Sequence, residues 1–404
     1  MNRFCHLPEE VLEDILLRLS PKSISSCKRV CKSWYSLINR KSFVSEHLRR
    51  SIDKARHLSS VSLFLKWKRQ ELTLDEIFTP FYKEGDRKQV MSLVTIYSEG
   101  DGNGDRLPCV IEEIELPPAP KTEEERFPKS IISTHCNGII CLFEAFHNQN
   151  DTTIFFNPTV GEFKFLRTPG LRPKFLHSGS GFGYDSKAND YKYVKLFSPL
   201  YHPPKAKAFV YSMRNDSWRE IKIDLEGKIC WIKHQGVYCN DVYYWWNVGS
   251  SNSEGMVLSF DMSNEEFRTI ALPDHVHEGN MKTRKLALWK GSVVFFFSPV
   301  NSWFSTSFEM WVMVDNFNGV KGLTYWTKHL TIGPLRCIHS PLTFWKDDEL
   351  LMETKDGRIV SYNLDTQNLR QLPIRGAVFP GTTFADLYLQ TLVSVKKELP
   401  NHIL

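Results

Sequence analysis

Long hydrophobic runs, paired cysteines and catalytic motifs are all missing from this 404-residue sequence. Its strongest apolar run, Val293–Phe297, is far too short to cross a bilayer, and acidic residues interrupt the N-terminal stretch where a signal peptide needs an apolar core. Nine cysteines occur without a single C-x-x-C pair. We therefore expect a protein of the cytosol or the nucleus, with no membrane partner and with reduced, mostly buried thiols.

Sequence signatures of catalysis and cofactor binding are also missing. There is no G-x-S-x-G elbow and no P-loop, and Gly179–Gly183 breaks the dinucleotide-binding pattern because a tyrosine stands where the third glycine belongs. His275 and His277 lack a third ligand at a familiar metal-site spacing. Cys136 and Cys141 lie in apolar runs, which predicts core thiols. The sequence predicts a chain without catalytic residues, cofactor or metal.

Charge is present, but it is unevenly distributed. Residues 1–70 hold fifteen Lys/Arg and six Asp/Glu, a net charge of +9, whereas the whole chain carries +5, so the remainder carries −4. The basic surplus does not extend into the long C-terminal part, so we expect no nucleic-acid partner. Aromatic residues make up 13% of the chain, which is typical of a β-rich globular protein.

A small block of helices is predicted within the first 50 residues. Its first stripe of apolar residues recurs at helical spacing: Val11, Leu12, Ile15, Leu16 and Leu19. Ser20 and Pro21 form a cap and a first helical position, a third turn contains Trp34, and Ser42 could cap another short helix. So small a block buries little surface, so its apolar residues either pack on the following domain or bind another protein.

The rest of the chain repeats a pattern of short strands at intervals of roughly 50 residues, a period typical of propellers and solenoids. Asn137-Gly138, Asn240-Asp241 and Lys290-Gly291 separate apolar strands and predict hairpin turns. A further unit would combine the apolar stretches between residues 61 and 116 with the segment 387–395. The expected fold class is α+β and multidomain: a small N-terminal helical unit followed by an all-β propeller of about six blades.

The N-terminal residues resemble the F-box along 7–16, 19–24 and 30–34, with Phe43 closing the match. Ser25-Ser26-Cys27 departs from it, since relatives often carry bulkier residues there. The resemblance implies a module that binds an acidic Skp-type adaptor and, through it, the cullin and RING subunits of a ubiquitin ligase. It implies adaptor contacts through twelve residues: Leu7, Pro8, Val11, Leu12, Ile15, Leu16, Leu19, Pro21, Val30, Cys31, Lys32 and Trp34.

The strand repeats resemble the kelch-like F-box-associated domain of plant F-box proteins. "GFGYDSKANDYKYVKL" and "PLTFWKDDELLMETKDGRIVSYNLDTQNLRQLP" are most similar to the S-locus F-box group. The resemblance implies an F-box over residues 1–50, a connecting helix or linker over 51–60, a propeller over 61–396 and a tail over 397–404. The function it implies is substrate recognition in an SCF-type ligase, with a non-self pistil S-ribonuclease as the target in pollen during self-incompatibility.

Three acidic residues, Glu123, Glu124 and Glu125, are the candidate contacts to such a basic target, although a proline-rich loop of this kind is also typical of a solvated linker. Two other functions fit the same sequence. The chain could be a receptor for an endogenous regulator of defence or hormone signalling. It could also be a scaffold outside any ligase, in which the apolar helical stripe packs on the propeller.

Overall fold

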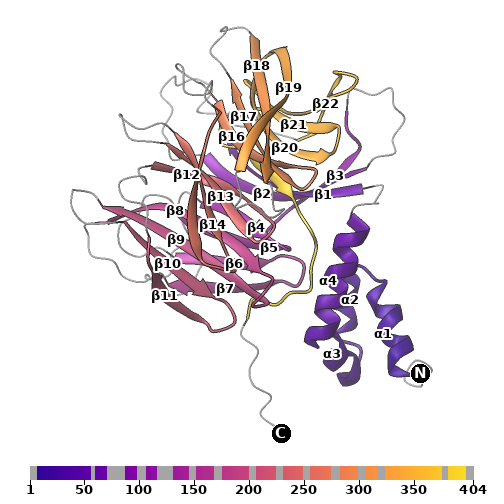
Figure 1. The fold of residues 1–404 in the computed structure, drawn as a ribbon. Coiled ribbons are helices and arrows are strands. Elements are labelled where there is room, and N and C mark those ends of the chain that lie inside the picture. Colours follow the sequence, from indigo (N-terminus) through magenta and orange to yellow (C-terminus); the bar gives the residue numbers. More distant parts are fainter. Residues whose placement is uncertain are drawn as a thin grey trace, which may run out of the picture.

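The protein consists of a small group of helices beside a larger body of strands (Figure 1). The computed structural model describes residues 7–55, 60–70, 87–97, 106–115, 131–144, 152–167, 175–199, 206–223, 231–248, 255–273, 283–298, 305–315, 324–374 and 381–396. Within these ranges, none of the helices is both long enough and apolar enough to cross a membrane.

The helices of the described N-terminal residues are α1 (Glu9–Leu17), α2 (Pro21–Cys27), α3 (Lys32–Ile38) and α4 (Lys41–Ala55). Ser20 caps α2 as predicted, because its hydroxyl accepts a hydrogen bond from the Ser23 N–H at 3.2 Å and Pro21 is the first helical residue. The last helix differs from the prediction: it begins before Ser42 and runs for 15 residues. Ion pairs of Arg49 with neighbours three and four residues away support this longer helix.

The helices pack around their own small hydrophobic core. Its buried members are Leu16, Leu17, Ile24, Leu37, Ile38 and Phe43. His47 of α4 is buried beside them, and its ring Nε2 donates a hydrogen bond to the carbonyl of Leu19 at 3.1 Å. This bond ties α4 to the end of α1.

The strands of the described residues form six four-stranded antiparallel sheets, the blades of a propeller. The first two sheets are β24-β1-β2-β3 and β4 to β7: β1 (Ser60–Gln70), β2 (Arg87–Tyr97), β3 (Cys109–Glu113), β24 (Phe384–Leu387), β4 (Ile131–Cys136), β5 (Ile139–Glu144), β6 (Thr152–Asn157) and β7 (Glu162–Arg167). The next two are β8 to β11 and β12 to β15: β8 (Phe175–Asp185), β9 (Asp190–Pro199), β10 (Lys207–Ser212), β11 (Ser217–Ile221), β12 (Trp231–Cys239), β13 (Val242–Val248), β14 (Met256–Asp261) and β15 (Glu266–Ala271).

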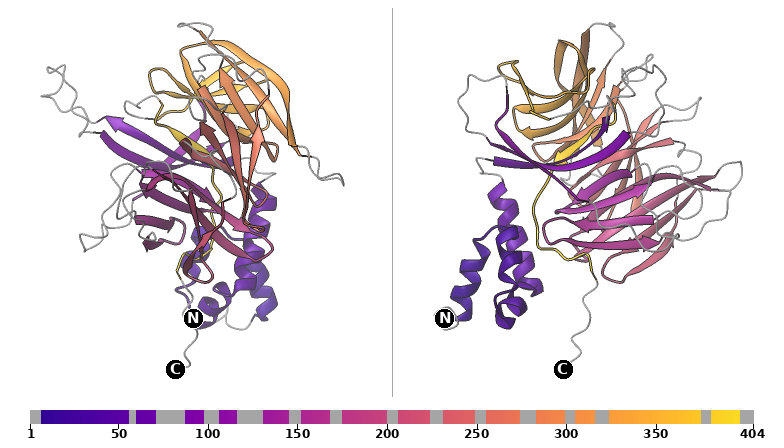
Figure 2. Two further views of the ribbon diagram at one scale, coloured as in Figure 1. Left: turned by 60° about the vertical axis from the view of Figure 1, so that its left-hand side comes forward. Right: turned by 180° about the vertical axis from the view of Figure 1, so that it is seen from behind.

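The last two sheets complete the ring and confirm the predicted propeller of six blades. They are β16 (Thr283–Trp289), β17 (Ser292–Ser298), β18 (Ser305–Asp315), β19 (Thr324–Arg336), β20 (Ile338–Lys346), β21 (Glu349–Thr354), β22 (Ile359–Asn363) and β23 (Leu369–Gln371). Figure 2 shows the blades from two further sides, with the helices at one flank of the ring.

The three predicted hairpin turns are confirmed between β4 and β5, β12 and β13, and β16 and β17. Both central residues of each turn have positive φ, as at Asn137 (47°) and Gly138 (78°). This backbone matches the right-handed twist of the flanking strands, and asparagine, aspartate and glycine adopt it at low cost.

The glycine-rich stretch Gly179–Gly183 was expected to form a structural turn, but it lies within strand β8. A Cβ atom on Gly181 would lie 2.6 Å from the Trp245 ring, which explains the need for glycine between two blades. Cys136 and Cys141 are buried in the preceding blade, and burial raises the pKa of both thiols. His275 and His277 lie outside the described residues.

The ring closes by pairing the two ends of the chain, as predicted, but through a different strand. The closing strand is β24, which pairs with β1, and only Leu387 of the expected segment 387–395 belongs to it. Strand β24 ends at Leu387, and side chains bind the backbone further on: the Asn157 amide donates to the carbonyls of Thr391 and Val393 at 3.1 and 2.8 Å.

Residues 388–396, which we call the C-terminal strap, connect the two units. The strap passes between the sheets and the helices (Figures 1 and 2). Its Leu392 is 2% exposed and belongs to the core of the helices, while its Val395 is buried in a core of the propeller. The strap therefore holds the helices against the second blade.

Candidate functional site

A row of exposed apolar side chains follows one side of α1. Leu7, Val11, Ile15 and Leu19 are all exposed, with Val11 at 46% and Ile15 at 45%. Val11 and Ile15 are four positions apart and so lie on the same face of α1, and Leu7 and Leu19 lie just beyond the two ends of the helix. We call these four residues the apolar stripe. A row of this kind on a water-exposed surface is typical of a protein–protein interface.

The same helix buries its other apolar side chains. Leu16 is 1% exposed and lies in the core, and Leu12 packs against that core from a partly buried position. The structure therefore separates the predicted contact residues of α1 into an outward set and an inward set. Leu16 can influence a partner only by supporting the helix.

The connection between α2 and α3 presents a second group of exposed apolar residues. Val30, at 62%, is the most exposed of the large apolar side chains in the described residues, and Tyr35 of α3 is 58% exposed. Trp34, its neighbour, is partly buried against the helical core. The sequence predicted Val30 and Trp34 as contacts and missed Tyr35, which helical spacing places opposite the inward residue Leu37.

Cys31 immediately precedes α3 and is partly exposed. It is the N-cap residue of that helix, and its Sγ atom lies 3.1 Å from the hydroxyl of Ser33. Hydrogen bonds from Ser33 and from the Trp34 backbone lower the pKa of the Cys31 thiol. Pro8 and Lys32 are exposed and Pro21 is partly buried, so each of the twelve predicted residues has been located.

The charged side chains of the helices are of two kinds. Most acidic ones are paired within the module: Asp14 binds Arg18 at 2.6 Å, and hydrogen bonds from Arg49 and Arg50 lower the pKa of Glu46 to about 2. Lys32 and Arg29, by contrast, are exposed and lie close to Val30 in the sequence. Positive charge beside an apolar surface favours the approach of an acidic protein.

The propeller does not cover the apolar stripe. Contacts between the two units involve Leu392 and Val160, which pack on the helical core, and an ion pair of Lys22 with Glu112 at 2.5 Å. Helix α1 lies on the side of the helices that is remote from the strands (Figure 1 and the right-hand view of Figure 2). The arrangement required by a scaffold with its stripe packed on the propeller is therefore not the one observed.

The proposed target contacts Glu123, Glu124 and Glu125 lie outside the described residues. Within the described part of the chain, no three His, Cys, Asp or Glu side chains are grouped in a way that could hold a metal ion. The exposed apolar surface of the helices is thus the feature whose geometry points most directly to a function.

Comparison with known proteins identifies both units. A family model described as an F-box associated beta propeller domain matches residues 94–379, and an F-box-like model matches residues 4–50. The S-locus subgroup expected from the sequence is not supported by these matches.

Several curated proteins from Arabidopsis thaliana are similar to this chain. An F-box/kelch-repeat protein is 29% identical over 96% of this chain and 96% of its own length. The F-box protein CPR1 is 22% identical, over 96% of this chain and 88% of its own. A putative F-box protein is 27% identical over 68% of this chain and 62% of its own. The chain belongs to the family of F-box proteins that carry an F-box-associated β-propeller domain.

Proposed function

We propose that this chain is a non-catalytic substrate-recognition subunit of an SCF-type ubiquitin ligase. In this role the helices bind a Skp-type adaptor, which links the chain to the cullin and RING subunits, and the propeller binds the protein to be ubiquitinated. Holding the target close to the ubiquitin-carrying enzyme raises the rate by proximity, so the receptor itself needs no catalytic residue.

The observation that carries the proposal is the exposed stripe Leu7, Val11, Ile15 and Leu19, beside a helix whose other apolar side chains face the core of the module. Exposed apolar surface is costly in water, and covering it stabilises a complex by about 25 cal/mol per Å² of area removed from solvent. The stripe and Val30 are among the positions at which F-box proteins are expected to contact their adaptor. The Leu392 contact, meanwhile, fixes the helices on the propeller.

The test is co-purification of the full chain with a plant Skp-type adaptor, using two matched valines. Val11 on α1 and Val110 on β3 are equally exposed, at 46% and 48%. Replacing each by glutamate adds the same charge to the same kind of site. We expect Val11→Glu to lose the adaptor and Val110→Glu to retain it.

If both variants bind the adaptor equally well, the stripe is not part of the interface. Loss of binding in both would point to a general effect of the added charge. Melting curves of the two variants check that each is folded, and because both valines are exposed we expect changes within about 0.5 kcal/mol of the wild type.

The target itself is proposed only as a protein. A pistil S-ribonuclease stays a prediction from the sequence, since its candidate contacts Glu123, Glu124 and Glu125 lie outside the described residues. Expression confined to pollen would favour it over an endogenous regulator of defence or hormone signalling.

A further inference from the structure

The propeller encloses a polar cavity near its axis. Its walls come from four blades, through β12, β16, β20 and β24, with Trp246 of β13 beside them. Its volume is about 160 Å³, below the range of about 300 to 1,000 Å³ that is typical of sites for drug-sized ligands. A group the size of one side chain or one small organic acid fits such a space.

Most charged groups of the cavity are already engaged within the protein. Glu353, 1% exposed, accepts hydrogen bonds from the Thr383 hydroxyl at 2.5 Å and the Gly381 N–H at 2.8 Å. The carboxylate of Asp386 lies 3.1 Å from Nε2 of His135. Lys285 and His339 have interactions of their own. These four side chains interact within the wall of the cavity, so their charges are largely compensated there.

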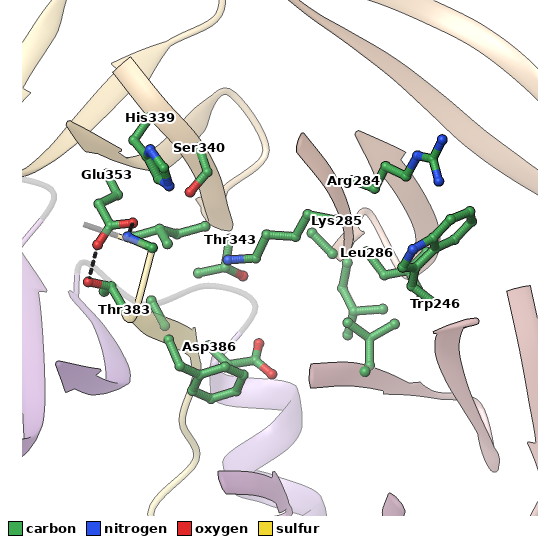
Figure 3. Close-up of a pocket in the computed structure, with 18 residues that line it drawn as sticks. Trp246, Arg284, Lys285, Leu286, His339, Ser340, Thr343, Glu353, Thr383 and Asp386 are labelled. Atoms are coloured by element: carbon green, nitrogen blue, oxygen red, sulfur yellow. Dashed lines mark hydrogen bonds between the residues drawn. The ribbon is translucent and has the colours of Figure 1, made fainter. Parts of the chain in front are cut away.

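Arg284 and Trp246 differ from these groups. The guanidinium of Arg284 stacks on the Trp246 ring, 5.1 Å from its centroid, at one end of the cavity (Figure 3). The Nε atom of Arg284 and the Nε1 atom of Trp246 are both buried, and neither has a hydrogen-bond partner in the described residues. Burial lowers the pKa of Arg284, as expected for a guanidinium without a counter-charge.

Two unsatisfied donors on neighbouring side chains are unusual, because buried N–H groups almost always find an acceptor. The indole of Trp246 is 1% exposed and packs against Phe295 at 5.3 Å, so it cannot turn to reach water. The stacking contact in turn holds the guanidinium in place. The two donors are therefore positioned in advance for an acceptor that enters the cavity.

We propose that this cavity binds a carboxylate group, with Arg284 as its counter-ion and the Nε1–H of Trp246 as a second donor. A planar carboxylate matches the forked donors of a guanidinium. A doubly charged phosphate fits less well, because Glu353 and Asp386 would repel its second negative charge. The carboxylate comes from an acidic side chain of a bound protein or from a free organic acid.

The position of the cavity suits a site that works independently of the adaptor surface. Arg284 and Thr383 lie at or next to the N-terminal ends of the inner strands β16 and β24. The strap and the helices lie at the opposite end of the ring, where Tyr388 donates to the carbonyl of Gly138 just beyond the C-terminal end of β4. A ligand at Arg284 therefore leaves the stripe on α1 free.

The test measures binding of a fluorescent octaglutamate peptide to the purified full chain, with octaglutamine as the neutral control. We expect Arg284→Gln to weaken octaglutamate binding about tenfold or more, since a charge-assisted pair is lost. Trp246→Phe keeps an aromatic ring but removes the N–H together with the five-membered ring of the indole; because the guanidinium remains, we expect a smaller loss of binding, about threefold. Arg268→Gln, which removes an exposed guanidinium that is 3.2 Å from Glu266, is the matched control and should bind like the wild type.

Competition separates the two sources of the carboxylate. If glutarate displaces the peptide, a free organic acid is a sufficient ligand; if it does not, the site requires a carboxylate presented by a protein chain. Melting temperatures show whether each variant is folded. Arg284→Gln removes a partly buried guanidinium whose Nε has no hydrogen-bond partner in the described residues, so we expect it to melt at or above the wild-type temperature. The proposal is overturned if the wild type binds neither octaglutamate nor glutarate. It is also overturned if Arg284→Gln and Arg268→Gln bind octaglutamate equally well.

Discussion

Ile15 and Leu16 are neighbours in the chain but point in different directions from α1, about 100° apart, so two similar side chains have different roles. Ile15 is exposed in the apolar stripe, whereas Leu16 fills the core beside Ile24 and Phe43. Helical spacing in the sequence located both residues but could not separate them, because α1 is apolar on more than one side. The separation comes from the packing of α2, α3 and α4, which decides the inward face.

Alanine substitutions at these two positions should have different effects. Leu16→Ala removes buried methyl groups, so we expect a loss of about 2 to 5 kcal/mol in the free energy of unfolding of the helices. Ile15→Ala should change stability by no more than about 0.5 kcal/mol and should weaken adaptor binding. Urea unfolding of the helical circular dichroism signal, together with adaptor titration, measures both. The reverse pattern would contradict the assignment of faces.

His47 should make the stability of the helices depend on pH. Burial lowers its pKa below the usual value of 6.5, with a smaller contribution from Arg50, so the unfolded chain takes up a proton at a higher pH than the folded chain does. The free energy of unfolding should therefore fall as the pH drops below about 6.5. His47→Gln can still donate to the Leu19 carbonyl and should show a shallower fall; equal slopes in urea unfolding at several pH values would count against this role.

At the scale of elements, the sequence predicted the turns and helix starts whose backbone geometry or capping only a few residue types provide. Asn137-Gly138 was recognised as a turn because few residue pairs adopt positive φ, and Ser20-Pro21 was recognised as a helix start. The closing strand was misplaced because 387–395 is the more apolar segment, whereas β24 is selected by its pairing with β1. Pairing between strands far apart in the chain produces no local sequence pattern.

The C-terminal strap should determine how firmly the helices sit on the propeller. Leu392→Ala withdraws a 2%-exposed side chain from the helical core, so we expect faster amide hydrogen exchange in α2 and α3 while the blades exchange as before. Ser394→Ala, which removes only an exposed hydroxyl that binds Glu162, is the control. Unchanged exchange in Leu392→Ala would mean that the strap does not support the helices.

At the scale of the whole molecule, the ring separates two surfaces. The helices present the apolar stripe at one flank of the ring (Figure 2). The cavity at Arg284 lies near the N-terminal ends of the inner strands, whereas the strap contacts the ring near their C-terminal ends. The cavity could not be predicted from the sequence, because its residues come from four blades and share no spacing. The stripe could be predicted, because all of its residues belong to one helix and its ends.

Reconstituted ubiquitin transfer tests the central claim most directly. The full chain is combined with a Skp-type adaptor, cullin and RING subunits, ubiquitin and the conjugating enzymes, and ubiquitin attached to the chain itself is measured. We predict attachment to the wild type and to Val110→Glu, and its loss in the double variant Val11→Glu, Ile15→Glu. Equal attachment to the double variant, or none to the folded wild type in the complete mixture, would contradict the account.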